Sequence, residues 1–323
     1  MGADEVAHAL RRADKILIAS HVRPDGDAVG SQLAAASILE AMGKRCRIVD
    51  ADPVPARYAF LDPGGRIEPP PPPSSIDADL ALVLDCAHRG RLGAVEKLLP
   101  PACGVANVDH HASGSSFGTV NWIDPALSSV GEMLWLLAED QSWEIPPPAV
   151  EAIYVAILTD TGRFTYDNTT PESHQIAAEA IRRGVDASAL ASRIYESLRR
   201  GEMDLRLRAM KSLSFDETGR IGWVVLTEED FARTGTVSLD AHEIVDIPRS
   251  VAGVEVAFLL TPVEGGEKVS LRSRGAVDVD ELARAFGGGG HRRAAGFTLR
   301  CAADRAREIT LSAITERLRG KEA

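Results

Sequence analysis

The sequence predicts an α/β protein: an N-terminal parallel-sheet domain with helices on both faces of the sheet, and a smaller C-terminal α+β domain. Residues 1–186 alternate short apolar runs with amphipathic stretches of helical spacing, as in parallel sheets covered by helices. Residues 211–323 place several strand-like runs around one helical run. The chain has 323 residues, 45% of them hydrophobic, which is more than one average domain uses.

Five apolar runs of the N-terminal domain are predicted strands: 15–20, 45–50, 80–85, 104–109 and 154–160. A helix is predicted after the first of them, from about Asp27 to Met42, and Gly43 suits the left-handed position that ends a helix. The proline-rich segment 68–75 is expected to be an exposed loop, because proline removes backbone donors and stiffens the chain.

Residues 187–210 have a helical pattern with charges on all sides, interrupted at Gly201, and are expected to link the domains. The domains are therefore predicted at 1–186 and 211–323. In the second domain we predict one helix and four strands. The helix is 278–286, and the strands are 221–227, 254–263, 267–273 and 294–300.

Charge and composition exclude several classes of protein. The formal net charge of -11 repels a long polyanion, so we do not expect a protein that binds long duplex nucleic acid. The four cysteines form no CxxC pair, which fits a reducing cytosol. The N-terminus has the pattern of a helix followed by a strand rather than a signal peptide, and no apolar run is long enough to span a bilayer. We expect a soluble, cytoplasmic protein with no membrane partner.

The segment 20–31, SHVRPDGDAVGS, carries the sharpest chemical signal. His21, Asp25 and Asp27 directly follow the first predicted strand. In open parallel sheets, ligands gather at the carboxyl ends of strands. Pro24 and Gly26 favour a tight turn, so the imidazole and the two carboxylates are expected to point into one volume.

Three further predicted strands end in similar groups. Asp85 ends one, Asp109, His110 and His111 end another, and Asp160 ends the last. A single aspartate after a strand commonly opens a turn or caps a helix. Carboxylates gathered at one edge would repel one another unless cations lay among them, so four such strand ends indicate a metal site.

The kinds of ligand indicate the metal and the chemistry. Imidazole and carboxylate ligands suit Mn²⁺ or a similar divalent ion rather than a thiolate zinc site, and there are enough for two ions. A metal pair about 3.5–4 Å apart lowers the pKa of a bound water and neutralises charge on phosphoryl oxygens. The predicted reaction is hydrolysis of a phosphate ester by water.

Asp109-His110-His111 resembles the trademark of the DHH phosphoesterase superfamily. Nearly the whole chain resembles its NrnA-like branch of bifunctional oligoribonucleases and pAp phosphatases, including the DHH-associated domain with GGGGHRRAAGF at 287–297. The resemblance implies that His111 faces the substrate phosphate and that Asp109 orients its neighbours. It also implies two metal sites that share one ligand: His21, Asp25 and Asp85 at the first, and Asp27, Asp85, His110 and Asp160 at the second.

The glycine run 287–290 suggests a binding role beyond the metals. Glycine amides can approach a phosphate closely, and His291 follows at once. The resemblance implies that Arg272, Ser273 and His291 contact the substrate, with its nucleotide end on Gly288, Gly289 and Gly290.

Other conspicuous residues receive ordinary interpretations. His88 and Arg91 follow Asp85 in the chain and are assigned to a surface or turn role. Asp50 ends a strand and is interpreted as structural. Arg163 is left open between a phosphate contact and a solvated side chain.

The combined hypothesis is an Mn²⁺-dependent phosphoesterase that hydrolyses short oligoribonucleotides to mononucleotides and 3'-phosphoadenosine 5'-phosphate (pAp) to AMP. The alternative hypothesis is a stand-alone phosphodiesterase that hydrolyses linear or cyclic dinucleotides, such as pApA or cyclic di-AMP. A nucleotide-binding sensor without turnover is disfavoured, because none of the expected ligands is substituted. The sequence leaves open the preferred substrate, the polarity of RNA digestion, the choice among Mn²⁺, Mg²⁺ and Co²⁺, and the oligomeric state, with a homodimer compatible.

Overall fold

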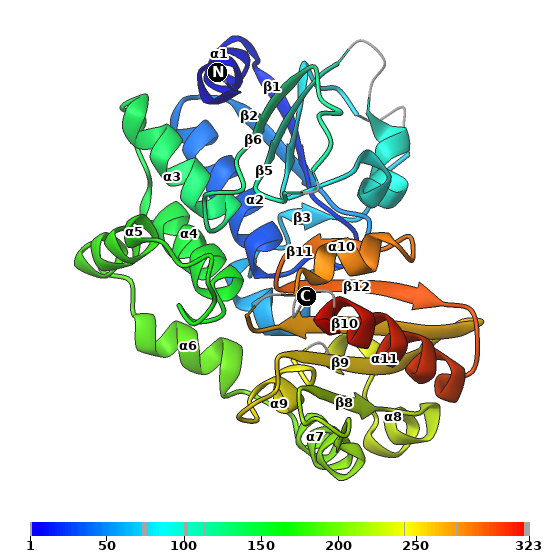
Figure 1. The fold of residues 1–323 in the computed structure, drawn as a ribbon. Coiled ribbons are helices and arrows are strands. Elements are labelled where there is room, and N and C mark those ends of the chain that lie inside the picture. The colour runs from blue at the N-terminus through cyan, green and yellow to red at the C-terminus, as the bar shows by residue number, and fades with distance from the viewer. Residues whose placement is uncertain are drawn as a thin grey trace. The chain divides into compact units, whose positions relative to one another are not determined.

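The chain divides into two compact units, Met1–Ser197 and Leu198–Ala323 (Figure 1). The computed structural model describes residues 2–72, 76–99, 103–112, 114–241, 243–275 and 277–319, with only the backbone of Leu239 and His291. The division lies between helices α6 (Ala187–Tyr195) and α7 (Arg200–Ser212), inside the segment expected to link the domains. Gly201 lies within α7, so the helical pattern is interrupted at residues 196–199 rather than at Gly201.

The first unit contains, in its described part, a six-stranded sheet whose strand pairs are all parallel. Its strand order is β3-β2-β1-β4-β5-β6, so the order reverses between β1 and β4. The short strands β3 and β6 were not predicted from the sequence. The bounds are β1 Lys15–Ala19, β2 Arg45–Val49, β3 Ile67–Glu68, β4 Leu80–Leu84, β5 Gly104–Asp109 and β6 Val120–Ile123.

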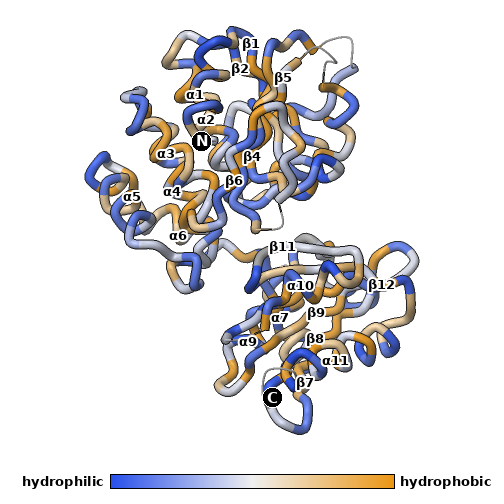
Figure 2. The backbone as a smooth tube through the Cα atoms, turned by 45° about the horizontal axis from the view of Figure 1, so that its top comes forward, coloured by the Kyte–Doolittle hydropathy of each residue, from blue (hydrophilic) through white to orange (hydrophobic). Residues whose placement is uncertain are grey.

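The two faces of this sheet are covered differently. One face, which includes Ile18 and Leu82, packs against the α-helices, and Figure 1 shows α2, α3 and α4 together on that side. The other face, which includes Leu17 and Val83, packs against the 3-10 segment η3. Figure 2 shows hydrophobic residues along much of β5, as expected of a strand between two layers. Besides α6, the helices and 3-10 segments described in this unit are α1 Gly2–Arg12, α2 Gly26–Ala41, α3 Val130–Asp140, α4 Pro147–Asp160, α5 Pro171–Arg182, η1 Ala56–Leu61 and η3 Arg89–Leu98.

The predicted strand 154–160 is wrong, because these residues form the second half of helix α4. The helix is buried over most of its surface, so its apolar run lacks the polar interruptions that reveal helical periodicity. Pro147 at the helix start and the fourteen-residue length were the available signals for a helix. Asp160 therefore ends a helix rather than a strand.

Helix α4 lies close against helix α2 because Gly30 has no side chain. A Cβ atom at Gly30 would come within 2.5 Å of the Ala152 carbonyl oxygen. This close contact brings the helix that carries Asp27 beside the helix that ends at Asp160.

The second unit has a mixed six-stranded sheet in its described part, of order β11-β12-β10-β9-β8-β7, with only β8 and β9 parallel. Helices α10 and α11 cover one face, and α7 and α8 cover the other, so the predicted α+β character is confirmed. The elements are β7 Ser214–Phe215, β8 Ile221–Val225, α8 Glu228–Thr234, η4 Ser238–Ala241, α9 Asp246–Arg249, β9 Val256–Val263, β10 Gly266–Ser273, α10 Val279–Arg284, β11 Gly289–His291, β12 Ala294–Leu299 and α11 Ala303–Arg319. Within the described ranges, no helix combines the length and apolar character that a bilayer crossing requires.

Candidate metal centre

The turn between β1 and α2 holds the first three candidate ligands. Asp25 caps α2, and its carboxylate accepts hydrogen bonds from the amides of Asp27 and Ala28, each at 3.1 Å. Asp27 lies in the first turn of α2, and its side chain is buried. His21 is also buried, at the carboxyl end of β1 where the strand order reverses. Ligands bind at such switch points in open parallel sheets.

Asp85 follows β4 in an unusual backbone conformation. Its φ of 53° lies in the left-handed region, while its amide donates to the Val108 carbonyl at 3.0 Å. Such a conformation costs a non-glycine residue about 1–3 kcal/mol and is concentrated at functional sites. The side chain is 2% exposed, and its Oδ1 atom has no hydrogen-bond partner among the described residues.

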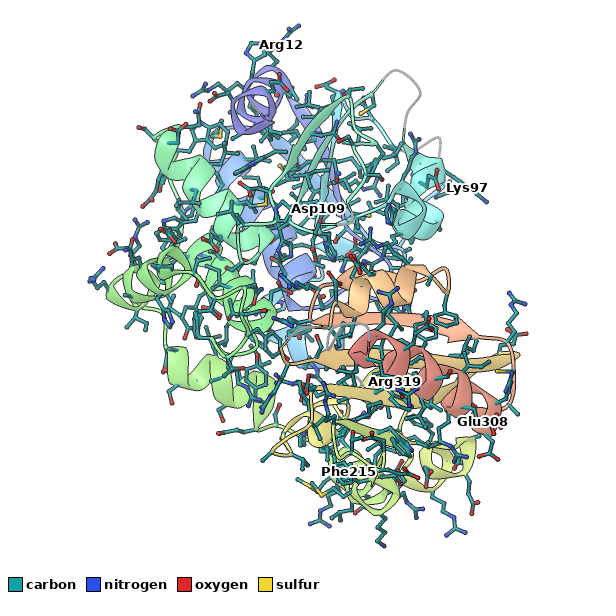
Figure 3. All side chains as sticks on the ribbon, viewed as in Figure 1. Arg12, Lys97, Asp109, Phe215, Glu308 and Arg319 are labelled. Atoms are coloured by element: carbon teal, nitrogen blue, oxygen red, sulfur yellow. The ribbon has the colours of Figure 1, made fainter. Side chains whose placement is uncertain are left out.

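The end of β5 supplies two histidines with fixed orientations. His111 Nδ1 lies 2.8 Å from Asp109 Oδ1, and His110 Nδ1 lies 3.2 Å from the Leu127 carbonyl oxygen. A carbonyl oxygen only accepts, so His110 carries its proton on Nδ1 and turns Nε2 toward the carboxylates. Asp109 lies inside the first unit, whereas Arg12 and Lys97 lie at its periphery (Figure 3).

These side chains form two clusters that share Asp85. In the first cluster, His21 Nε2 lies 3.3 Å from Asp85 Oδ2 and 3.8 Å from Asp25 Oδ2. In the second, His110 Nε2 lies 3.5 Å from Asp160 Oδ2, 3.7 Å from Asp27 Oδ2 and 3.7 Å from Asp85 Oδ1. The structure thus brings together all six residues that the resemblance assigned to metals, and Asp85 reaches both clusters through different oxygen atoms.

The residues present fit divalent cations. Ligand atoms on one ion of this kind lie about 2.0–2.6 Å from it, so partner atoms are expected about 3–4 Å apart, as they are in both clusters. Asp85 Oδ1, which faces the second cluster, has no hydrogen-bond partner among the described residues and is free to bind a cation. The neighbouring thiol of Cys86 donates to the His88 carbonyl, and burial raises its pKa to about 12, so it stays protonated.

The carboxylates repel one another without a cation. Burial, followed by Asp27 and Asp25, raises the pKa of Asp85 well above 3.8. Burial would lower the pKa of His110, but Asp160, Asp27 and Asp85 outweigh it and raise the pKa to about 9. Cations between these groups would remove the repulsion.

His111 behaves in the opposite way to His110. Burial, the neighbouring His110 and the guanidinium of Arg91 hold the pKa of His111 well below 6.5. Its imidazole is therefore neutral at physiological pH.

Helix α3 holds Asp27 in place. The amides of Val130 and Gly131, at the start of the helix, donate to the Asp27 carboxylate at 2.7 and 3.0 Å, and Ser31 Oγ donates at 2.7 Å. A helix N-terminus favours a negative charge at this position. The ligand is consequently fixed before any metal arrives.

Asn168 holds Asp160. Its side-chain amide donates to the Asp160 carbonyl at 3.1 Å, to Asp160 Oδ2 at 3.3 Å and to the Ser128 carbonyl at 3.1 Å. Ser128 precedes α3, so one amide connects the segment before that helix to the ligand that ends α4. No sequence pattern indicates this role, because Asn168 also contacts Ser128, forty positions earlier in the chain.

Replacing Asn168 by alanine should loosen Asp160 without removing it. We expect Mn²⁺ affinity to fall about 10- to 100-fold, as is typical when a residue that orients a ligand is lost. Titration of the metal into Asn168→Ala and wild type checks this. An unchanged affinity would show that Asp160 needs no support from Asn168.

Two other residues behave as the sequence suggested, and one does not. Asp50 accepts from the Ser20 amide at 3.0 Å and Gln32 at 2.8 Å, which is a structural role. His88 is exposed, with Nδ1 3.2 Å from Ser115 Oγ. Arg91, assigned to a surface or turn role, instead places Nη2 3.0 Å from His21 Nδ1.

Arg163, which the sequence left open, places its guanidinium 4.6 Å from the centre of the Tyr195 ring. Its backbone φ of 63° and the φ of 59° at Phe164 put two successive residues in the left-handed region just after α4. The stacking on Tyr195 gives Arg163 a partner within its own unit.

In the second unit, the candidate substrate residues lie around β10 and β11. Arg272 Nη1 donates to the Leu271 carbonyl at 3.0 Å, while its buried Nε has no partner among the described residues. Ser273 is buried, with Oγ 3.4 Å from the Arg292 carbonyl oxygen. The His291 side chain lies outside the described residues.

The glycine run is more ordered than the expected phosphate-binding loop. Part of it is strand β11, paired with β12, and the amides of Gly288 and Gly290 donate to Ala283 O and Asp280 Oδ1 at 2.9 Å each. A Cβ atom at Gly288 would lie 2.1 Å from the Gly296 carbonyl oxygen. These two glycines therefore allow close pairing with β12, and their amides are already occupied.

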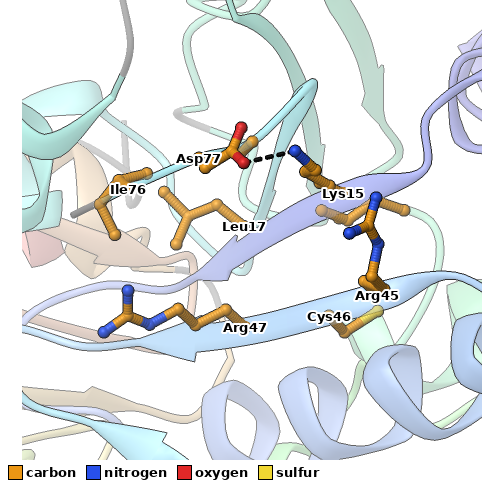
Figure 4. A pocket seen from close by; sticks show the side chains of 9 residues that line it. Lys15, Leu17, Arg45, Cys46, Arg47, Ile76 and Asp77 are labelled. Carbon is orange, nitrogen blue, oxygen red and sulfur yellow. Dashed lines mark hydrogen bonds and ion pairs between the residues drawn. The ribbon is translucent and has the colours of Figure 1, made fainter. Parts of the chain in front are cut away.

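A pocket of about 220 Å³ lies where β1 and β2 begin, at the opposite ends of the strands from the ligand clusters (Figure 4). Its basic residues already have acidic partners: Lys15 pairs with Asp77, Arg45 with Asp14, and Arg47 with Glu68. This pocket offers little free charge to an anion.

Comparison with known proteins gives the family. The model of the DHH family, N-terminal domain, matches residues 15–157, and that of the DHHA1 domain matches residues 228–319. A bifunctional oligoribonuclease and PAP phosphatase NrnA from Thermus thermophilus is 35% identical over 97% of this chain and 93% of its own. The chain belongs to the DHH phosphoesterase family. As a member of this family, it is a hydrolase of phosphoester bonds.

Two further matches extend over most of this DHH protein. The bifunctional oligoribonuclease and PAP phosphatase NrnA of Bacillus subtilis is 28% identical over 91% of the chain and 92% of its own length. The crystal structure of an exopolyphosphatase-related protein from Bacteroides fragilis superposes with a TM-score of 0.88 and 25% identity, covering 98% of this chain and 96% of the other. The fold of both units is therefore found in a solved structure as well.

Proposed function

We propose that this protein is a cytoplasmic, two-metal phosphoesterase that hydrolyses short oligoribonucleotides to mononucleotides and pAp to AMP. The names of the Thermus and Bacillus relatives support this choice of substrates. The net charge of -11 supports small anionic substrates over long duplexes. Mn²⁺ is the proposed metal because the ligands combine imidazole nitrogen with carboxylate oxygen.

The buried carboxylate of Asp85 is the observation that carries the proposal. It lies between His21 and His110, offers one oxygen to each cluster, and has an unbonded Oδ1. We propose that His21, Asp25 and Asp85 hold one divalent cation, and that Asp27, Asp85, His110 and Asp160 hold the other. Cations bound there would activate water and neutralise charge on the phosphoryl oxygens.

His111 and Asp109 are proposed to serve the substrate rather than the metals. Asp109 fixes the His111 ring through Nδ1, which leaves Nε2 directed away from Asp109. The neutral imidazole gains a proton more readily when an anionic phosphate lies beside it, and can then donate a hydrogen bond to that phosphate.

The second unit is proposed to bind the nucleotide end of the substrate through Arg272, Ser273, Gly288, Gly289, Gly290 and His291. Arg272 Nε is buried and has no hydrogen-bond acceptor among the described residues. This supports the role, because a guanidinium readily donates hydrogen bonds to phosphate. The contribution of Gly288 and Gly290 is the close pairing with β12 that their absent side chains permit, since their amides donate within the unit.

A panel of substrates tests the proposed function. With Mn²⁺, we expect turnover of pAp and of RNA dimers to pentamers, and little cleavage of pyrophosphate. His110→Ala serves as the inactive control for contaminating phosphatases. Preference for pApA or cyclic di-AMP would favour the dinucleotide phosphodiesterase, and dominant pyrophosphate cleavage would contradict the assignment of the C-terminal domain.

A further inference from the structure

The backbone of Arg91 is fixed against the loop that carries His21. The Val22 amide donates to the Arg91 carbonyl oxygen at 2.7 Å. Two residues later, a Cβ atom at Gly93 would lie 2.6 Å from Val22 Cγ1, and the φ of Gly93 is 58°, so glycine permits this close contact. The fold therefore places the backbone of Arg91 beside the loop that carries the metal ligand His21.

The side chain of Arg91 is half-buried and, among the residues that the structure describes, forms no close ion pair with a carboxylate. Its Nη2 atom lies 3.0 Å from His21 Nδ1. Arg89, two residues earlier, is exposed and does pair, with Glu96 at 3.2 Å. An unpaired guanidinium beside a reaction centre lacks the anionic partner that it normally has.

The approach of Arg91 to His21 gives the guanidinium no acceptor. His21 Nδ1 lies 2.8 Å from the Val22 carbonyl oxygen, which only accepts, so Nδ1 carries a proton and Nε2 faces Asp85 and Asp25. A protonated Nδ1 cannot accept a hydrogen bond from the guanidinium 3.0 Å away. The positive side chain therefore lies beside a metal ligand with its donors free for an anion.

We propose that Arg91 is a phosphate-binding residue of this centre, whose guanidinium contacts the substrate's phosphoryl group. The proposal rests on the proposed function, because the phosphate is that of the substrate. A planar guanidinium can donate two parallel hydrogen bonds to phosphoryl oxygens and stabilise the charge that develops on them. Arg91 would thus add a positive side chain to a site otherwise dominated by acids.

The test compares Arg91→Ala with wild type in two binding measurements and one kinetic measurement. For the Mn²⁺-loaded protein, we expect the dissociation constant for inorganic phosphate to rise at least about tenfold, because a charge-assisted contact is lost. The affinity for Mn²⁺ alone should stay within about threefold, or tighten, because a positive charge leaves the centre. The kcat/KM for pAp should fall about 10²- to 10³-fold, as for other groups that stabilise phosphoryl charge.

Control variants separate this role from a structural one. Arg89→Ala should leave all three quantities unchanged, and Arg91→Lys, which keeps the charge and most of the stem, should recover part of the phosphate affinity even if Arg91→Ala folds poorly. Weaker Mn²⁺ binding with unchanged phosphate binding would overturn the proposal and assign Arg91 to the orientation of His21. Phosphate binding can be measured without turnover. A wild type that hydrolyses no substrate would therefore contradict the proposed function, and the phosphate affinities of the Arg91 variants would still test the role of Arg91.

Discussion

Replacing Asp85 by asparagine should abolish phosphoester hydrolysis and, at the same time, stabilise the metal-free protein. The substitution keeps the shape of the side chain and removes the carboxylate that both ligand clusters share. We expect kcat/KM to fall by about 10³-fold or more, because both proposed metals lose a ligand. Steady-state kinetics with pAp and saturating Mn²⁺ measure this loss.

The stability of the same variant should change in the opposite direction. Asp85 is buried, with a raised pKa, so ionising it in the folded, metal-free protein is costly. A raised pKa contributes stability that is present below pH 3.8 and is lost as the pH rises through the folded-state value. The free energy of unfolding of metal-free Asp85→Asn should therefore exceed that of metal-free wild type by about 1 kcal/mol or more at neutral pH. This difference should shrink toward pH 4.

Asp50→Asn is the matched control for Asp85→Asn. Asp50 is also a buried aspartate with a pKa that burial raises, but it belongs to neither cluster. Gln32 Oε1 lacks a partner among the described residues, so Gln32 can turn its amide to accept from the new asparagine. Asp50→Asn should keep the activity and Mn²⁺ affinity of wild type. Their loss would show that the effect of Asp85→Asn is not specific to the ligand clusters.

Removing the metals should have an effect as large as removing Asp85. After chelation, we expect pAp hydrolysis to fall by about 10³-fold or more and to return when Mn²⁺ is added. Mn²⁺ at 100 times its dissociation constant should also stabilise wild type by about 2.7 kcal/mol, because the ion binds the folded centre and not the unfolded chain. Thermal unfolding with and without the ion measures this shift.

Asp85→Asn supplies the control for the chelation experiment. Its thermal unfolding should respond much less to Mn²⁺, because the shared ligand is gone. Full hydrolysis by thoroughly chelated wild type would contradict a metal mechanism for this DHH protein.

The sequence predicted the location of the site better than it predicted the elements that build it. His21, Asp85 and His110 follow three parallel strands, and the carboxyl ends of such strands necessarily meet at one edge. Asp160 also reaches the site, but from the end of α4, which the sequence suggested as a strand. A buried helix and a buried strand look alike over a short apolar run.

The residues that hold the ligands could not be predicted from the sequence. Asn168 binds Asp160 through a side-chain amide, and Arg91 reaches His21 across seventy positions in the chain. Hydrogen bonds between distant residues leave no periodic pattern and no local spacing. The pairing of the glycine run with β12 was not predicted either, because it depends on backbone contacts across a hairpin.

Anomalous scattering from crystals of the wild-type protein soaked in Mn²⁺ tests the shared-ligand centre most directly. We predict two manganese peaks about 3.5–4 Å apart, both bonded to Asp85, one also bonded to His21 and the other to His110. A single peak, or peaks that do not touch Asp85, would contradict the two-metal centre.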